Sequence, residues 1–293
     1  MSSAERYRFL RGHGTQNDFV LLPDHDGRVH GELPADRVRA LCHRRAGLGG
    51  DGVMRVIRSD AAPVRTATHG QDAEWFMDYR NADGSLSEMC GNGIRVFARH
   101  LASEGLVDPA APVPVATRDG VKVITFADPA DPTSDITVDM GTPALLGSTA
   151  VGIGERRWAA LGVDMGNPHA VAFLADGEDL DSVGELRTPP DHDPAFYPDG
   201  VNVEFVVRRG PAHVGMRVHE RGSGETRSCG TGACAVMVAT AIADGESAGT
   251  EPPRDRDYRV DLPGGTLTIR WAREDRILMT GPAVIVAEGT TDL

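Results

Sequence analysis

Apolar residues recur at helical spacing in the stretch that follows Cys90. Spacing of i, i+3, i+4 and i+7 places apolar side chains on one face of a helix. The residues with this spacing are Ile94, Phe97, Ala98 and Leu101. Gly105 stands where such a helix could end in a left-handed residue. The pattern therefore predicts an amphipathic helix that begins at Cys90 and stops at Gly105.

A second helix is predicted after Cys229, and its pattern is different. Residues 233–239 are apolar at every position, and Asp244-Gly245 follows as a stop signal. A helix without a polar face is stable where protein surrounds it on all sides. We therefore expect this helix to be buried inside a domain and to end at Asp244-Gly245.

Alternating apolar and polar residues mark strands that could enclose these helices. Clear examples occupy residues 136–140 and 267–271, and further helical segments are expected at 38–42 and 180–186. Strands and helices are thus mixed along the chain. The patterns predict an α+β fold in which each domain is a β-sheet or barrel wrapped around a central α-helix.

The two halves of the chain carry the same landmarks in the same order. Asn17 precedes an Asp-Gly-Val sequence at Asp51 by 34 residues, and Asn167 precedes the same sequence at Asp199 by 32 residues. A Cys-Gly-x-Gly sequence then follows in each half. Matched order and spacing over half a chain indicate internal duplication, and two repeats of this length suggest paired domains.

The duplication predicts two pseudo-symmetric domains with the active site in the cleft between them. The repeated Asp-Pro pairs within residues 127–132 read as the linker. We expect residues 1–130 to form the N-terminal domain, joined by a returning C-terminal segment at 284–293. Residues 131–283 are expected to form the C-terminal domain.

Composition restricts the class of partner. The 293 residues are 40% hydrophobic and 25% charged, an ordinary globular balance, and the formal net charge is −13. A surface that binds nucleic acid or an anionic membrane needs a local excess of Lys and Arg, so neither partner is expected. The sequence has no apolar stretch of membrane-spanning length, and its start lacks the apolar core of a secretory signal. We expect a cytoplasmic protein.

Cysteine and lysine usage argue against common cofactors. The four cysteines are Cys42, Cys90, Cys229 and Cys234. They show neither a Cys-x-x-Cys sequence nor Cys/His spacing typical of zinc, so free thiols and no metal are expected. Lys122 is the single lysine, and it lies where a turn enters a strand. A pyridoxal phosphate enzyme needs a lysine for its Schiff base, so no cofactor is expected.

Cys90 and Cys229 each open a predicted helix, which is a favourable place for a reactive thiol. The helix N-terminus favours the thiolate, and the glycines that follow leave backbone N–H groups uncovered for a carboxylate. Two such thiols can remove a proton from one face of a carbon and supply a proton to the other face. A buried, inert cysteine beside a tight turn is the simpler interpretation of one such sequence, and duplication of the sequence weakens it. We assign core packing to Cys42 and Cys234.

Four short sequences together carry a resemblance to a known family. They are Asn-Ala-Asp-Gly-Ser at 81–85, Met-Cys-Gly-Asn-Gly at 89–93, Gly-Asn-Pro-His at 166–169 and Glu-Arg-Gly-Ser-Gly-Glu-Thr at 220–226. On these motifs the chain closely resembles diaminopimelate epimerase from Gly14 to Gly281. The resemblance implies a cofactor-independent isomerase of two mirrored domains. Such an enzyme interconverts LL- and meso-diaminopimelate for lysine and cell-wall precursor synthesis.

The resemblance also implies roles for individual residues. Cys90 and Cys229 would be the thiol–thiolate pair that alternates as acid and base, and His169 and Glu220 would help each thiol to lose its proton. The residues that would hold the substrate, mainly at its non-reacting end, are Asn17, Asn81, Asn167, Asn202, Glu220 and Arg221. The helix-start residues that would bind the reacting carboxylate are Gly91, Asn92, Gly230 and Thr231. A homodimer is the candidate assembly for such an enzyme.

These residue types suit a substrate with two amino-acid ends. Arg binds a carboxylate through two hydrogen bonds, Glu pairs with an ammonium group, and Asn can serve either. Simpler interpretations exist for each. Asn17 and Asn81 could form turns, His169 could be a hydrogen-bonded core histidine, and Glu220-Arg221 could be a surface pair.

One position departs from the family pattern. Many members have Gln after the Asp of the first-half loop, whereas this chain has Gly52. A side-chain contact to the substrate is then absent, so a water or another residue must take its place. The same loop matches the glycine pattern of dinucleotide-binding proteins at residues 47–52. A strand-like run follows it instead of a helix, which argues against that function.

Three other functions remain open from the residues. A proline or hydroxyproline racemase would share the paired cysteines, but its substrate has one carboxylate and would leave the Asn residues without a purpose. A cysteine hydrolase with Cys90 as nucleophile and His169 as base would leave Cys229 unexplained. A non-catalytic amino-acid-binding module would survive the loss of either thiol.

Overall fold

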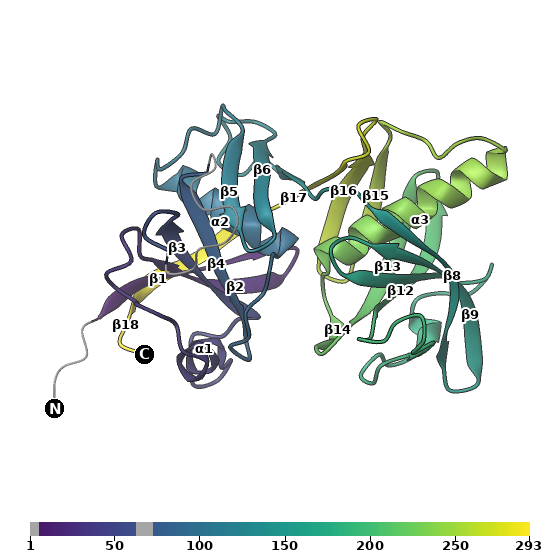
Figure 1. Cartoon of the computed structure of the whole chain (residues 1–293), viewed down its shortest axis with the longest axis horizontal. Coiled ribbons are helices and arrows are strands. Elements are labelled where there is room, and N and C mark those ends of the chain that lie inside the picture. Colours follow the sequence, from purple (N-terminus) through teal and green to yellow (C-terminus); the bar gives the residue numbers. More distant parts are fainter. Residues whose placement is uncertain (1–5, 63–72) are drawn as a thin grey trace. The chain divides into compact units, whose positions relative to one another are not determined.

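The computed structural model describes residues 6–62 and 73–293, and the chain divides into two compact units (Figure 1). Unit 1 comprises Met1–Val138 and Gly281–Leu293, and unit 2 comprises Asp139–Thr280. Residues 127–132, expected as the linker, instead form a turn inside unit 1 between two antiparallel strands. The boundary therefore lies at 138/139. The first five residues, which entered the argument about a secretory signal, lie outside the described residues.

Unit 1 is mostly β-sheet. Its strands are β1 (Tyr7–Gly14), β2 (Asn17–Pro23), β3 (Gly52–Arg58), β4 (Trp75–Asn81), β5 (Val113–Thr117), β6 (Gly120–Phe126), β7 (Ile136–Asp139) and β18 (Val284–Thr291). Its helices are α1 (Ala35–Cys42) and α2 (Gly91–Ser103). β18 is the returning C-terminal segment, and it pairs with β1.

Unit 2 repeats this composition. Its strands are β8 (Ala144–Ile153), β9 (Arg156–Asp164), β10 (Pro168–Phe173), β11 (Asp191–His192), β12 (Asn202–Gly210), β13 (His213–Glu220), β14 (Gly224–Thr226), β15 (Asp257–Leu262), β16 (Gly265–Trp271) and β17 (Ile277–Gly281). Its helices are the short 3₁₀ helix η1 (Asp181–Val183) and the long α3 (Gly230–Ala248).

The two units have the same strand topology. In unit 1 the strand order is β18-β1-β2-β3-β4-β5-β6-β7, with parallel pairing at β2–β3 and β4–β5 and antiparallel pairing elsewhere. In unit 2 the order β8-β9-β10-β12-β13-β15-β16-β17 has its parallel pairs at the corresponding places, β10–β12 and β13–β15. The internal duplication and the α+β class are confirmed.

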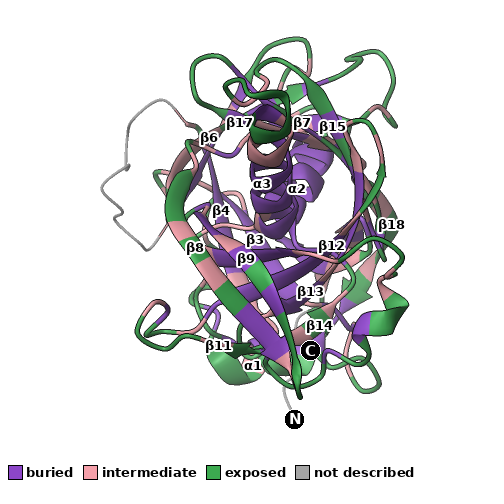
Figure 2. Cartoon of the chain, turned by 90° about the vertical axis from the view of Figure 1, so that its right-hand side faces the viewer, coloured by how far each residue is buried: buried purple, intermediate pink, exposed green. Residues whose placement is uncertain are grey.

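Each unit is built around one of the two cysteine-led helices. α2 contacts β1, β2, β3 and β18, and α3 contacts β9, β10, β12, β13, β15 and β16. Figure 2 colours both helices as buried over most of their lengths. The apolar stripe of α2 and the wholly apolar start of α3 explain this placement, because each buries its apolar side chains against a sheet.

The predicted helix ends were correct for α2 and too early for α3. Gly105, with φ of 68°, follows α2 in the left-handed conformation that the sequence suggested. α3 continues through Gly245 to Ala248, and Gly249 takes the left-handed position. The chain then turns back over the helix, so that a Cβ atom at Gly245 would lie 2.8 Å from the Thr250 carbonyl oxygen. Gly245 is needed for this close approach rather than for termination.

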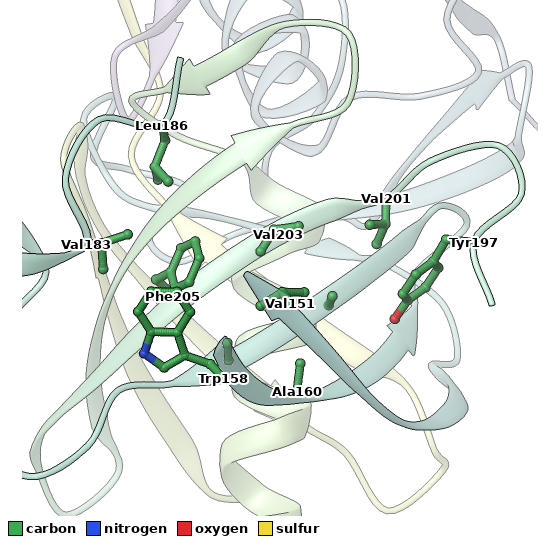
Figure 3. Packing of buried hydrophobic residues seen from close by; sticks show 11 residues of the cluster. Val151, Trp158, Ala160, Val183, Leu186, Tyr197, Val201, Val203 and Phe205 are labelled. Atoms are coloured by element: carbon green, nitrogen blue, oxygen red, sulfur yellow. The ribbon is translucent and has the colours of Figure 1, made fainter. Parts of the chain in front are cut away.

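The helix expected near residues 180–186 was wrong in extent. The structure forms one 3₁₀ turn there, η1, and Gly184 with φ of 84° ends it. The apolar residues Val183 and Leu186 nevertheless join the core of unit 2. Figure 3 shows this core, in which the indole of Trp158 meets the ring of Phe205 edge-on, with 5.1 Å between ring centroids.

Successive side chains of β12 in unit 2 point to opposite faces of the sheet. Val203 and Phe205 of β12 point into the core shown in Figure 3. Ala170 of β10 belongs to the same core. The intervening side chains point to the opposite face of the sheet. Among them is Glu204, whose carboxylate lies against the first turn of α3. The α3 face of this sheet therefore carries buried polar groups.

Candidate active site

Cys90 is the N-cap residue of α2, as predicted. Its backbone is extended, with φ of −138° and ψ of 115°, and its Sγ accepts a hydrogen bond of 3.4 Å from the Gly93 N–H group. The thiol also lies 3.6 Å from Oδ1 of Asn17. The structure therefore places the first candidate thiol at a helix N-terminus, in contact with a predicted substrate residue.

Asn17 is held in place by the residues around it. Its Nδ2 donates to Asp51 at 2.7 Å, and its Oδ1 accepts from Nδ2 of Asn92 at 3.3 Å. Asn92 is buried, and its own Oδ1 accepts from the buried Arg95 at 3.0 Å. Both amides are already hydrogen-bonded to protein groups. In this unit they therefore help to hold the Cys90 side chain in place.

Asp51 belongs to a charged cluster. The sequence analysis used Asp51 as a landmark of the duplication without assigning it a role. Arg44 contacts it at 2.6 Å and also contacts Asp18 at 2.8 Å. The pKa of Asp18 is lowered in spite of the opposing effect of burial, because Arg44 and Arg11 stabilise its carboxylate. The cluster therefore keeps Asp51 fixed beneath Asn17.

Asn81 and Gly52 lie opposite each other at the ends of β4 and β3. Nδ2 of Asn81 donates to the Ser85 hydroxyl at 3.0 Å. A Cβ atom at Gly52 would lie 2.4 Å from Cε2 of Tyr79 and 2.9 Å from its hydroxyl oxygen. The ring of Tyr79 thus occupies the space above Gly52, and a side chain at residue 52 is excluded.

Cys229 repeats the geometry of Cys90 in unit 2. It is the N-cap residue of α3, with φ of −118° and ψ of 113°, and its Sγ accepts a hydrogen bond of 3.4 Å from the Gly232 N–H group. The Thr231 hydroxyl lies 3.5 Å from the same sulfur. Gly230 and Thr231 form the first turn of α3, where backbone N–H groups have no partner within the helix.

The acidity of Cys229 differs from the expectation. A helix N-terminus should lower the pKa of a thiol. Burial instead raises the pKa of Cys229 well above its ordinary value, and the nearby Glu220 and Glu204 carboxylates raise it further. The hydrogen bonds from Thr231 and Gly232 act in the opposite direction without reversing the shift. The environment of Cys229 therefore favours the neutral thiol over the thiolate.

His169 lies in a fully buried polar chain. Its Nδ1 is 2.6 Å from Oε1 of Glu204, and its Nε2 is 3.0 Å from Oδ1 of Asn167. Neither His169 nor Glu204 exposes any surface. His169 is thus a hydrogen-bonded core histidine, as the simpler interpretation held, and it also supports a predicted substrate residue.

Asn202 and Arg221 connect the loops around this chain. Nδ2 of Asn202 donates to the Pro168 carbonyl at 3.0 Å, and its Oδ1 accepts from the Arg221 N–H group at 2.9 Å. The Arg221 guanidinium donates to the Asp199 carbonyl at 2.9 Å. Both ends of the Asn202 amide are used, so its place in the site is to fix the loop that carries Arg221.

Glu220 ends β13 and accepts a hydrogen bond from the Thr226 hydroxyl on the next short strand. Thr226 also lines a cavity of about 480 Å³ in unit 2. The other lining residues are Arg187, Ser223, Gly224, Glu225, Arg227 and Pro263. The cavity holds neither Cys229 nor Glu220, so it adjoins the candidate residues rather than containing them.

The predicted residues therefore fall into two groups, one in each unit. Unit 1 holds Asn17, Asn81, Cys90, Gly91 and Asn92, and unit 2 holds Asn167, His169, Asn202, Glu220, Arg221, Cys229, Gly230 and Thr231. Sequence reasoning missed Glu204. Its signal is a single carboxylate among apolar residues at positions 203–207 of β12.

Residues 6–62 and 73–293 contain no group of three or more His, Cys, Asp or Glu side chains arranged to hold a metal ion. In the same residues, no helix is both long enough and apolar enough to cross a membrane. All four cysteines are free thiols, and Cys42 and Cys234 are buried as expected.

Comparison with known sequences identifies relatives over nearly the whole chain. The family model for diaminopimelate epimerase matches residues 9–146 and 161–286. Diaminopimelate epimerase from Streptomyces coelicolor is 58% identical over 290 residues, covering 98% of this chain and 96% of the relative. Diaminopimelate epimerase from Rhodococcus opacus is 43% identical, with 97% and 96% covered.

Solved structures with the same fold are more distant. A hydroxyproline epimerase from Agrobacterium vitis, with bound trans-4-hydroxy-L-proline, superimposes with a TM-score of 0.67 at 15% identity, covering 99% of this chain and 94% of that one. A protein from Pseudomonas aeruginosa described as a predicted epimerase gives a TM-score of 0.67 at 12% identity, with 97% and 99% covered. At these identities the likeness supports the fold alone.

Proposed function

The chain belongs to the diaminopimelate epimerase family, and from this premise we propose that it inverts one α-carbon of diaminopimelate by exchanging protons with Cys90 and Cys229. The activity is that of an isomerase in lysine and cell-wall precursor synthesis. The observation that carries the mechanism is the matched geometry of the two thiols. Each sulfur caps its own helix and accepts the N–H group three residues later, at 3.4 Å in both units.

The reaction needs one thiolate and one thiol. The thiolate takes the α-proton, and the electron pair of the broken C–H bond is delocalised into the adjacent carboxylate. The thiol then donates its proton to the opposite face of the carbon, so that the two sulfurs exchange protonation states. Backbone N–H groups at Gly91 and Gly230 are suited to stabilise the negative charge on the carboxylate.

Cys229 enters this cycle as the thiol. Its raised pKa supports this assignment, because burial and two carboxylates disfavour its thiolate. Glu220 is one of these carboxylates, and a substrate ammonium group bound beside it would offset its charge. In the reverse reaction Cys229 must lose its proton, and binding of the substrate would make that loss easier.

Substrate recognition is proposed to use the polar residues around each thiol. Arg221 is anchored through one nitrogen to the Asp199 carbonyl, and its remaining N–H groups can bind a distal carboxylate. Asn81 and Asn167 are half-buried at strand ends and suit the polar groups of a second amino-acid end. Proline and hydroxyproline have no such second end, which disfavours them as substrates.

The decisive experiment is α-proton exchange in heavy water. Purified protein incubated with LL- or meso-diaminopimelate should place one solvent deuterium at the inverted α-carbon, with no covalent adduct in the mass spectrum. L-proline and trans-4-hydroxy-L-proline serve as competing substrates. Exchange on either of these and none on diaminopimelate would overturn the proposal, and an acyl-enzyme adduct would favour a hydrolase.

We also propose a homodimer in the cytoplasm. β18 is paired with β1 along one edge, and its outward side chains Val284 and Val286 are 43% and 56% exposed. An exposed apolar strand at a sheet edge favours association with a second chain. Light scattering should give twice the chain mass, and Val286→Glu should give the monomer.

The free thiols support the cytoplasmic location, because they are consistent with a reducing compartment.

A further inference from the structure

The hydroxyl group of Thr226 makes a contact that the proposed chemistry does not use. It donates a hydrogen bond to Oε1 of Glu220, because a carboxylate can only accept. Burial raises the pKa of Cys229 most, and the negative charge of Glu220 raises it further. The hydroxyl group of Thr226 therefore contacts a carboxylate that acts on the thiol of unit 2.

The contact follows from the register of the sheet. β13 and β14 pair antiparallel, with Glu220 opposite Gly224 and Val218 opposite Thr226. Two residues that are diagonal to each other across such a pair share a face, and long side chains can bridge the distance between them. Gly224, opposite Glu220, has no side chain that would fill the space on this face. The hydroxyl group of Thr226 can therefore reach the carboxylate of Glu220.

The same face of the sheet meets the first turn of α3. Glu204 of β12 is opposite Val218 of β13, and Glu220 follows two residues later on the same face. A Cβ atom at Gly232 of α3 would lie 2.6 Å from Oε1 of Glu204. Cys229 is the N-cap residue of this helix. This placement explains why Glu220 and Glu204 both add to the effect of burial on the pKa of Cys229.

The two carboxylates differ in their freedom to move. Glu204 is fully buried, and its Oε1 lies 2.6 Å from Nδ1 of His169 on β10. Glu220 is half-buried at the end of β13, and the cavity of about 480 Å³ adjoins Thr226 beside it. A long side chain can exchange between rotamers where space allows. The hydrogen bond from Thr226 restricts this exchange for Glu220.

We propose that Thr226 is a positioning residue that keeps the Glu220 carboxylate near Cys229. The inference rests on the proposed function for the reaction that Cys229 carries out. Thr226 acts through Glu220 and takes no part in proton transfer itself. A carboxylate fixed in this place stays where a substrate ammonium group would offset its charge, as the proposed cycle requires.

The first test needs no activity. In the full-length protein labelled with ¹³C at cysteine Cβ, the NMR shift of each Cβ changes when its thiol ionises, and Cys229→Ser assigns the signal. Thr226→Val keeps the shape of the side chain but lacks the hydroxyl group, so the Glu220 carboxylate can move away. The Cys229 signal should then change at a lower pH than in the wild-type protein, because a nearby negative charge opposes ionisation. Glu220→Gln should act in the same direction, and Thr226→Ser, which keeps the hydroxyl group, should match the wild-type protein.

Thr266→Val is the matched control. The hydroxyl group of Thr266 donates to Oδ1 of Asp261 at 2.8 Å, so it also joins a half-buried threonine to a carboxylate within unit 2. Asp261 lies on β15 and pairs with Arg209. Thr266→Val should lower the stability to urea by an amount similar to Thr226→Val and leave the Cys229 signal unchanged. The comparison separates a role at the thiol from a structural role.

The second test is kinetic and uses diaminopimelate. Thr226→Val should lower kcat/KM roughly tenfold, the effect of losing one hydrogen bond to a charged group. Its alkaline limb should move to lower pH, as in Glu220→Gln. The double variant should have the same alkaline limb as Glu220→Gln alone, because Thr226 acts through Glu220. Thr226→Ser and Thr266→Val should keep the wild-type profile.

Different results would overturn different claims. A Cys229 signal that changes at the same or a higher pH in Thr226→Val ends the positioning role, whether or not the protein epimerises diaminopimelate. A further shift of the limb in the double variant beyond that of Glu220→Gln would also end it. Absence of turnover on diaminopimelate, with the expected NMR shifts, would instead contradict the proposed function and leave the Thr226–Glu220 arrangement standing. If Thr226→Val does not fold, Thr226→Ala removes the same hydroxyl group and decides.

Discussion

The ring of Tyr79 lies over Gly52, so that a Cβ atom at residue 52 would be 2.4 Å from Cε2 of the ring. The same atom would be 2.5 Å from the Arg80 carbonyl oxygen. The ring also meets Phe19 edge-on at 5.7 Å, which fixes its position. Gly52 is therefore part of the packing between β3 and β4.

Gly52→Ala should consequently destabilise the protein. An added methyl group collides with both a packed ring and a backbone oxygen, and overpacking of this kind costs about 1–3 kcal/mol. Urea unfolding of the two proteins measures the difference. Gly50→Ala is the matched control, since its nearest contacts at 3.4 Å are ordinary. Equal stability of the two alanine variants would show that β3 and β4 adjust freely.

Replacement of either capping cysteine should abolish epimerisation. Cys90→Ala and Cys229→Ala each remove one of two proton-transfer groups, and loss of one such group reduces the rate by at least about 100-fold. Substrate should still bind, which calorimetry can measure. Cys42→Ala and Cys234→Ala remove buried core thiols and should retain turnover. Near-normal turnover in either capping variant refutes the two-base mechanism.

Periodicity located the helices because helix formation and burial share one local signal. Apolar residues follow Cys90 with i, i+3, i+4 spacing and follow Cys229 without interruption. Each pattern indicates a helix with an apolar surface that other parts of the protein must bury. The helix expected near Leu180 failed for the opposite reason. Its apolar residues lie in an irregular loop and pack into the core from there. Gly184 ends the 3₁₀ helix after one turn.

The sequence motifs predicted which residues to consider for the site, but not the tertiary contacts that these residues make. Glu204 and His169 are 35 residues apart and meet across the parallel strands β10 and β12, so their contact follows from register. The raised pKa of Cys229 depends on its burial, whose effect is larger than the opposing effect of the hydrogen bonds at the helix N-terminus. Both features depend on tertiary packing, which a local sequence motif does not reveal.

The raised pKa of Cys229 predicts a pH dependence. The thiol form is the acid in one direction of the reaction, and the raised pKa of Cys229 keeps this form beyond the pH at which an ordinary thiol ionises. The alkaline fall in kcat/KM should therefore come at a higher pH than the ionisation of an ordinary thiol would give. Glu220→Gln removes a negative charge that raises this pKa, so the alkaline limb should move to lower pH.

Glu225→Gln provides the control for this pH profile. Glu225 lies in the same region but pairs with Arg217, and it does not contribute to the shift at Cys229. Its profile should match that of the wild-type protein at high pH. An alkaline limb that stays in place in Glu220→Gln would mean that Cys229 does not set it.

The buried ion pair of Arg55 and Asp24 offers the sharpest stability prediction. Their atoms Nε and Oδ2 are 2.8 Å apart, and the side chains are 2% and 1% exposed. Removing one partner leaves the other charge buried, so Asp24→Ala should cost about 3–5 kcal/mol. The exposed pair of Arg270 and Asp257 has a similar distance, 2.7 Å, and Asp257→Ala should cost less than about 1 kcal/mol. Urea unfolding measures both, and equal costs would show that water reaches Arg55.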